Sequence, residues 1–385
     1  MAKRWWWPPW WKKLQRVPVP DLPDDVLLEI LSRVPYMSLC RFRCVSRSWR
    51  ALCSDPALLR KAPQTLSGFI FSDLDNSSSL RFLNLSGKGR PLLDPPLPFL
   101  SHYGCILLYH SCNGLLLLIC ECVKPPGKLY ESDYVVCNPA TKKWVVLPQD
   151  TSTLQGATRQ HMSLVFDPAV SSHFKVFMFL RDGGLGQITA ALIFSSESGA
   201  WAYRESKLGD NNNILLSFGS DEPYFNDTLH VTAIGCSSVL AVDSEGTTWR
   251  NIPWPCPMDK SSSRCIGQSL GHLHAIQVDT NNARQLSVWV LEDYDTGRWT
   301  LKHTVSFCTF DLYGRRPRGV CDVIGMHPES NLVFIIRRSR QQCYLMSYNM
   351  DNRKVTKFIC ALDEYSLRPY APYIPCFGEW FTDGH

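Results

Sequence analysis

The feature that most constrains the fold is a strand, turn and strand pattern that recurs at nearly regular spacing after residue 66. Each copy is an apolar run, a polar turn and a second run that begins at Trp144, Trp201, Trp249, Trp299 or, without the tryptophan, Val355. These starting residues lie 57, 48, 50 and 56 positions apart. A period near fifty residues is typical of a β-propeller, because a four-stranded blade buries its faces only against neighbouring blades.

Six units of this length account for residues 67–385, so we predict an all-β domain that forms a six-bladed β-propeller. One blade fewer or more, and a pair of β-sandwiches, are the alternatives. Ring closure is expected to pair residues 373–377 with residues 68–71, because an open ring would leave two sheet edges exposed.

The first part of the chain follows a different pattern. Residues 1–19 are basic and aromatic with several prolines, which predicts a disordered leader. Residues 20–61 contain three short amphipathic patterns, and the first runs from Pro23 to Pro35 with acidic residues at its start. We therefore predict a small all-α module. So short a module cannot bury all of its large apolar side chains, and some of them should await a partner.

Charge and cysteine content exclude several classes of protein. Residues 1–64 hold 12 Lys/Arg against 5 Asp/Glu, whereas residues 65–385 hold 28 against 30. The large domain thus lacks the basic field that nucleic acid binding needs. The 16 cysteines are scattered and no secretory signal is evident, which favours reduced thiols in a cytoplasmic or nuclear protein. The most apolar stretch, residues 105–120, is interrupted by polar residues, so no membrane span is expected.

Residues 22–35, LPDDVLLEILSRVP, and 38–50, SLCRFRCVSRSWR, resemble the F-box. The shared features are the opening Leu-Pro, the Glu-Ile-Leu core, the Leu-x-Arg-Phe-Arg segment and the closing Trp-Arg, although Val34 stands where leucine is commoner. The remainder is similar to the F-box-associated β-propeller regions of plant F-box proteins, in phrases such as Phe166-Asp167-Pro168 and Leu345-Met346-Ser347-Tyr348.

The resemblance implies a non-catalytic, substrate-recognition subunit of a Skp-cullin-F-box (SCF) ubiquitin ligase. Such a subunit binds a Skp-type adaptor, and through it a cullin–RING scaffold, while its propeller holds a protein substrate. A non-degradative scaffold that binds the adaptor is the main alternative, and a propeller enzyme is a further one. Matched motif positions imply that the adaptor contact and the small core of the module are formed by Leu22, Pro23, Ile30, Leu31, Pro35, Leu39, Phe42, Val45 and Trp49.

The sequence does not identify the protein substrate. Loops on one face of the ring are the expected site, because they can vary without disturbing the blades. Among them, the aromatic residues Tyr224, Phe225 and Tyr313 are the candidates for substrate contact.

Three short motifs suggest a chemistry that their context does not support. Residues 267–271 match Gly-x-Ser-x-Gly, but a strand-like run follows where a nucleophile elbow needs a helix. His272 and His274 lack a third metal ligand nearby, and no Cys-x2-Cys pair is present. We therefore predict no catalytic residue, no metal site and no cofactor.

Overall fold

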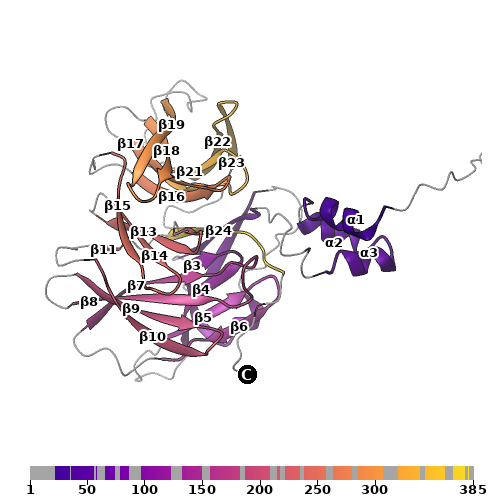
Figure 1. Cartoon of the computed structure of the whole chain (residues 1–385), viewed down its shortest axis with the longest axis horizontal. Helices are drawn as coiled ribbons and strands as arrows, with labels where there is room; N and C mark the ends of the chain where they lie inside the picture. Colours follow the sequence, from indigo (N-terminus) through magenta and orange to yellow (C-terminus); the bar gives the residue numbers. More distant parts are fainter. Residues whose placement is uncertain are drawn as a thin grey trace, which may run out of the picture. The chain divides into compact units, whose positions relative to one another are not determined.

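A computed structural model describes residues 22–34, 36–55, 58, 66–73, 79–85, 97–122, 132–149, 157–182, 187–208, 215–216, 222–234, 238–256, 263–279, 285–306, 320–338, 343–359, 367–377 and 380. The predicted leader, residues 1–19, lies outside this range. The chain divides into two compact units, Met1–Pro63 and Gln64–His385. Figure 1 shows the first as a helical unit and the second as a set of sheets.

The small unit contains three short helices, as predicted: α1 (Asp24–Leu31), α2 (Tyr36–Phe42) and α3 (Arg47–Leu52). Asp24 and Asp25 occupy the first turn of α1, where their negative charges interact favourably with the positive end of the helix dipole. The Ser46 side chain caps α3 by accepting a hydrogen bond from the Trp49 N–H at 3.2 Å. None of the helices in the described part of the chain has the length and apolarity that crossing a membrane requires.

The large unit is a six-bladed β-propeller, which confirms the prediction of fold class and number of blades. Its six sheets follow one another along the chain (Figure 1). The first blade combines β1 (Gly68–Asp73), β2 (Ser79–Asn84) and β24 (Leu367–Tyr373). The second comprises β3 (Tyr103–Cys112), β4 (Leu115–Cys122), β5 (Ser132–Asn138) and β6 (Lys143–Val146), preceded by the short 3-10 helix η2 (Pro98–Leu100). The third comprises β7 (Ala157–Val165), β8 (Lys175–Asp182), β9 (Ile188–Ser195) and β10 (Ala200–Glu205).

The remaining three blades have the same antiparallel order. The fourth contains β11 (Leu215–Leu216), β12 (Tyr224–Phe225), β13 (Thr228–Ile234), β14 (Ser238–Asp243) and β15 (Trp249–Pro253). The fifth contains β16 (Ser263–Ser269), β17 (His272–Asp279), β18 (Gln285–Asp293) and β19 (Arg298–Ser306). The sixth contains β20 (Val320–Met326), β21 (Leu332–Arg338), β22 (Cys343–Asn349) and β23 (Lys354–Ile359).

The ring is closed by a strand from the end of the chain. β24 pairs antiparallel with β1, from Gly68 opposite Tyr373 to Ser72 opposite Leu367. The prediction placed this pairing at residues 373–377, and only Tyr373 of that run belongs to the strand. The following segment instead packs against the second blade, where the Asn138 side-chain amide donates to the Cys376 carbonyl at 2.8 Å.

The repeated sequence pattern corresponds to the turn between the third and fourth strands of a blade. A polar side chain at the end of the third strand accepts hydrogen bonds from the turn, as Asn138 does from the Ala140 N–H at 3.0 Å. The tryptophan is the first or second residue of the outer strand that follows. Two of these indoles reach the preceding blade, since Trp201 donates to the Pro148 carbonyl at 2.7 Å and Trp299 to the Pro253 carbonyl at 2.8 Å.

Apolar clusters fill the spaces between successive blades. Between the third and fourth, for example, the ring of Phe179 packs edge-on against Trp249, with centroids 6.0 Å apart. Each sheet therefore buries its faces against its neighbours, which is why the closing strand matters to the entire ring.

Candidate adaptor-binding and target-binding surfaces

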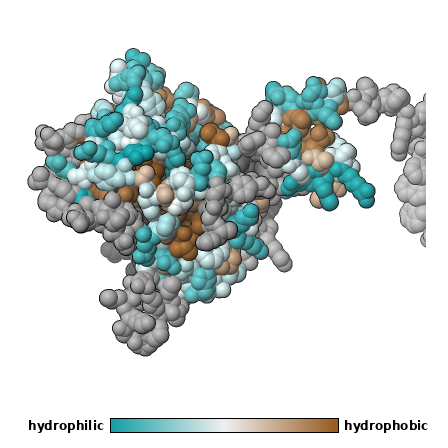
Figure 2. All heavy atoms as spheres, turned by 60° about the horizontal axis from the view of Figure 1, so that its bottom comes forward, coloured by the Kyte–Doolittle hydropathy of each residue, from teal (hydrophilic) through white to brown (hydrophobic). Residues whose placement is uncertain are grey.

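The helical unit exposes large apolar side chains that its own core does not use. Leu22 is 51% exposed, Ile30 50% and Val45 66%, and Val26 is also exposed. Figure 2 shows hydrophobic residues, in brown, gathered on the visible face of this unit. Exposure of apolar groups in so small a unit is typical of a surface that another protein covers.

The residues matched to the F-box motif divide into three groups. Leu22, Pro23, Ile30 and Val45 are exposed. Leu31 and Leu39 are buried in a small core with Cys53 and Leu58, against which Phe42 and Trp49 pack as a half-buried, edge-to-face pair with centroids 5.5 Å apart. Pro35 lies outside the described residues.

The apolar stripe of α1 is therefore wider than the core needs. Val26, which was not among the predicted contact residues, lies one helical turn before Ile30, and both are exposed. Sequence periodicity alone cannot separate these two from Leu31, because all three are large aliphatic residues in the same helix.

Short turns of the propeller gather on one face of the ring, which we call the turn face. It comprises the turns between first and second strands and between third and fourth strands, at residues 113–114, 139–142, 166–174, 196–199, 226–227, 244–248, 270–271, 294–297, 327–331 and 350–353. Hydrogen bonds join neighbouring turns of this face. Asn113 donates to the Phe166 carbonyl at 2.7 Å, and the Leu270 N–H donates to the Pro328 carbonyl at 2.7 Å.

Tyr224 and Phe225, two of the predicted substrate-contact residues, form β12 beside the 226–227 turn of this face. Both side chains are only partly exposed. The Tyr224 hydroxyl donates to Asp227 Oδ1 at 2.7 Å, and burial raises the pKa of the phenol. Tyr224 also packs against two apolar clusters, so it contributes to the blade interior. Tyr313 lies outside the described residues.

A cavity of about 310 Å³ lies between the fourth and fifth blades, next to β12. It is lined by Asn226, Thr228, Ala241, Asp243, Thr248, Arg250 and Tyr294. Sequence reasoning did not find it, because Tyr294 comes from a different blade than the six other residues.

Two interactions shape the walls of this cavity. Arg250 Nη1 donates to Asp295 Oδ1 of the next blade at 2.8 Å, in an ion pair with both side chains exposed. The Asp243 carboxylate accepts hydrogen bonds from the Thr247 N–H at 2.7 Å, the Thr247 hydroxyl at 2.6 Å and the Thr248 N–H at 2.9 Å. Burial raises the pKa of Asp243, but these hydrogen bonds outweigh it and hold the pKa below its ordinary value.

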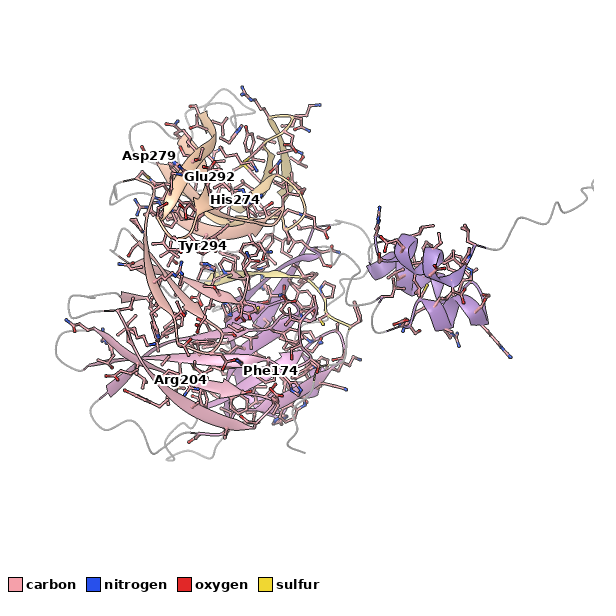
Figure 3. The ribbon with its side chains drawn as sticks, in the orientation of Figure 1. Phe174, Arg204, His274, Asp279, Glu292 and Tyr294 are labelled. Carbon is pink, nitrogen blue, oxygen red and sulfur yellow. The ribbon has the colours of Figure 1, made fainter. Side chains whose placement is uncertain are left out.

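Tyr294 is held in place by a buried histidine of the fourth blade. Figure 3 shows Tyr294 at the side of the fifth blade that faces β13 and β14. His230 Nδ1 lies 3.1 Å from the Pro223 carbonyl, which can only accept, so Nδ1 carries the proton. Nε2 therefore accepts from the Tyr294 hydroxyl at 2.7 Å. Burial lowers the pKa of His230 to about 4 and raises the pKa of Tyr294 to about 12.

A buried polar cluster, also not predicted from the sequence, joins three blades near their first strands. Glu222, which precedes β12, accepts a hydrogen bond from the Ser163 hydroxyl at 2.5 Å, and His161 Nε2 lies 2.5 Å from its other oxygen. His110 Nε2 lies 3.6 Å from Glu222 Oε2, the oxygen that Ser163 contacts. The Nδ1 atom of His110 accepts a hydrogen bond from the Leu164 N–H at 3.0 Å. Burial lowers the pKa of His110 although the nearby carboxylate opposes this shift.

This cluster is arranged to hold the blades together. Ser163 donates to the carboxylate and not to a histidine, which differs from the hydrogen-bond chain of an activated serine nucleophile. Since His110 Nδ1 accepts a hydrogen bond, Nε2 carries the proton and is not available to ligate a metal. Glu222, His110 and His161 are all buried, with at most 4% of each residue exposed.

The remaining motifs have structural roles. Ser269, in the Gly-x-Ser-x-Gly match, is buried at the end of β16, and its hydroxyl donates to the Ser330 carbonyl at 3.1 Å. The strand β17 follows directly, so no nucleophile elbow forms. His274 is buried on β17 and His272 is exposed. Within the described residues, no group of three or more His, Cys, Asp or Glu is placed to hold a metal ion.

Two parts of the chain match known families. Residues 19–61 match the F-box domain, and residues 97–367 match the β-propeller of F-box proteins described as At3g26010-like. The fold and the F-box together define an F-box protein with a C-terminal propeller. The chain belongs to the family of F-box proteins with an At3g26010-like β-propeller.

Its relatives are plant F-box proteins. It is 27% identical to F-box protein At5g07610 of Arabidopsis thaliana over 73% of this chain and 70% of the relative. It is also 27% identical to F-box protein At5g49610 of the same plant, over 74% and 79% respectively. Among solved structures, a chain of the nidogen/laminin complex aligns at 8% identity with a TM-score of 0.40, covering 76% of this chain and 93% of that one. So low a score carries no argument about function.

Proposed function

We propose that this chain is the substrate-recognition subunit of an SCF-type ubiquitin ligase. Its F-box unit would bind a Skp-type adaptor, and through it a cullin–RING scaffold, while the propeller holds a protein target. The observation that carries the proposal is the exposed apolar surface of the F-box unit, formed by Leu22, Val26, Ile30 and Val45.

In this proposal the chain supplies proximity and no chemistry. A target held on the propeller would meet the charged ubiquitin carrier at a high effective concentration, which is a recognised source of rate enhancement. The proposed place of action is the cytoplasm or nucleus, where scattered cysteines such as those of this sequence stay reduced.

The residues of the F-box unit would then contribute in two ways. The exposed residues Leu22, Pro23, Ile30 and Val45 would contact the adaptor directly, with Pro35 beside them in the motif. The buried Leu31 and Leu39, and the partly buried Phe42 and Trp49, would hold the helices in the geometry that presents this surface. Mutation of the exposed group should therefore weaken adaptor binding directly, whereas mutation of the buried group should disturb the packing of the helices.

The test is a pull-down of the Skp-type adaptor with the double variant Ile30→Ser, Val45→Ser. Both side chains are half exposed or more, so their replacement should leave the folded unit intact while it removes apolar contact area. We expect the adaptor to be lost from the pull-down. The matched control is Val170→Ser, an exposed valine on the propeller. Undiminished capture by a folded double variant would refute the proposal.

A further inference from the structure

The cavity between the fourth and fifth blades contains one cationic side chain with an easily displaced partner. Arg250 and Asp295 form a single hydrogen-bonded ion pair, and the Asp295 side chain is 84% exposed. Exposed pairs of this kind contribute little stability, because both ions remain well solvated. A guanidinium carries five N–H donors, and Asp295 is engaged through Nη1 alone.

The rest of the lining is mostly polar. Asn226, Thr228 and Thr248 place amide and hydroxyl groups around the cavity. Asp243 also lines it, but the turn already satisfies both of its carboxylate oxygens. Asp243 is therefore less able than an unbonded carboxylate to pair with Arg250. A volume of 310 Å³ is at the small end of ligand sites and suits one side chain.

We propose that this cavity binds an acidic side chain of the protein held by the propeller, whose carboxylate pairs with Arg250 in place of Asp295. The inference rests on the proposed function, since it names the kind of target side chain that the propeller takes. Asp295 already shows the proposed interaction within the chain, because its carboxylate, from the neighbouring blade, pairs with the Arg250 guanidinium. The cavity also lies beside β12, where the sequence placed two of its substrate-contact residues.

A carboxylate fits better than a phosphate group. Arg250 is the single cation among the lining residues, all of which the structure describes, and Asp243 balances its charge. Asp227 and Asp295 lie in the turns on either side. A doubly charged phosphate would meet these carboxylates with one guanidinium to offset them, whereas a carboxylate needs only one planar, bidentate partner.

The probe is the capped pentapeptide acetyl-Gly-Ala-Glu-Ala-Gly-amide, added at millimolar concentration to the full-length chain and observed by saturation-transfer difference NMR. Matched peptides carry glutamine, lysine or phosphoserine at the central position. We expect the glutamate peptide to give the strongest signal. Equal signals from the glutamate and glutamine peptides, or a stronger one from the phosphoserine peptide, would overturn the choice of a carboxylate.

Three variants connect the signal to the cavity. Arg250→Gln should abolish it, and the matched control Arg298→Gln should not, because Arg298 forms an exposed ion pair with Glu292 and does not line the cavity. Asp295→Asn removes the internal competitor and should raise the affinity about two- to fivefold. If Arg250→Gln fails to fold, as judged by its thermal transition, Asp295→Asn still decides, and an unchanged affinity in that variant contradicts the proposal.

Adaptor pull-down with the same variants separates this inference from the proposed function. Arg250→Gln should capture the Skp-type adaptor as the unmodified chain does. A chain that binds the glutamate peptide through Arg250 but no adaptor would contradict the proposed ligase role alone. A chain that binds the adaptor but shows no Arg250-dependent peptide signal would contradict the cavity's assignment alone.

Discussion

At the scale of single residues, Glu222 is a buried carboxylate that links three blades of the propeller. It is buried among Ser163, His161 and His110, which belong to two other blades. Removing one member of such a cluster leaves the others buried without their partner, so Glu222→Ala should lower the free energy of unfolding by about 3 kcal/mol. Urea denaturation measures this change.

The matched control for that prediction is Glu245→Ala. Glu245 pairs with Lys175 at the surface, and loss of an exposed pair should cost less than about 1 kcal/mol. A loss of stability in Glu222→Ala no greater than in the control would mean that the buried cluster does not hold the blades.

The buried histidines predict a dependence of stability on pH. Burial lowers the pKa of His230 and of His274 to about 4, and that of His110 is also lowered. In the unfolded chain each would titrate near 6.5, so the folded state binds fewer protons and loses stability as the pH falls from about 6.5 toward 4. For His230, whose side chain is fully enclosed, the loss approaches about 3 kcal/mol.

Urea midpoints between pH 7.5 and 5 test this prediction. His230→Gln removes one titrating group, and its stability should fall less steeply with decreasing pH than that of the unmodified chain. Parallel curves for the two proteins would show that His230 is not responsible for the acid sensitivity.

At the scale of elements, the turn before each outer strand is the unit that the sequence reveals most clearly. Its polar cap and its tryptophan are neighbours in the chain, so the pattern repeats visibly. The Asn138 side chain also donates a 2.8 Å hydrogen bond to the Cys376 carbonyl. Asn138→Ala should therefore cost about 2 kcal/mol, and the equivalent change Ser195→Ala about 1 kcal/mol or less, in urea denaturation. Equal losses would show that the link to Cys376 contributes nothing.

A sequence pattern of this kind involves only residues that are close in the chain, which explains what the sequence could not predict. Glu222 meets His110 and His161 across blade boundaries, and no short-range pattern marks such a contact. Arg250 and Tyr294 come together for the same reason. In α1, Ile30 and Leu31 are both aliphatic, and only the packing of the three helices decides which is exposed. Order along the chain was thus predictable, and contacts between distant segments were not.

At the scale of the whole molecule, ring closure by β24 predicts a sharp sensitivity to truncation. Deleting residues 367–385 would remove the partner of β1 and take the buried side chains of Tyr370 and Tyr373 from their clusters. The domain should then aggregate or lose cooperative thermal unfolding. Deleting only residues 381–385 is the control and should leave the transition unchanged. A soluble long truncation with a normal melting transition would argue against closure of the ring.

Pairing of Gly68 with Tyr373 also fixes an order of events during synthesis. The two partner strands are among the first and the last of the propeller to be translated, and a contact between segments so far apart in sequence forms late in folding. The F-box unit has no such requirement, because its three helices are complete within its own residues. A nascent chain can thus fold its F-box unit while the propeller is still an open ring. Synthesis of β24 then becomes the step that allows the ring to close.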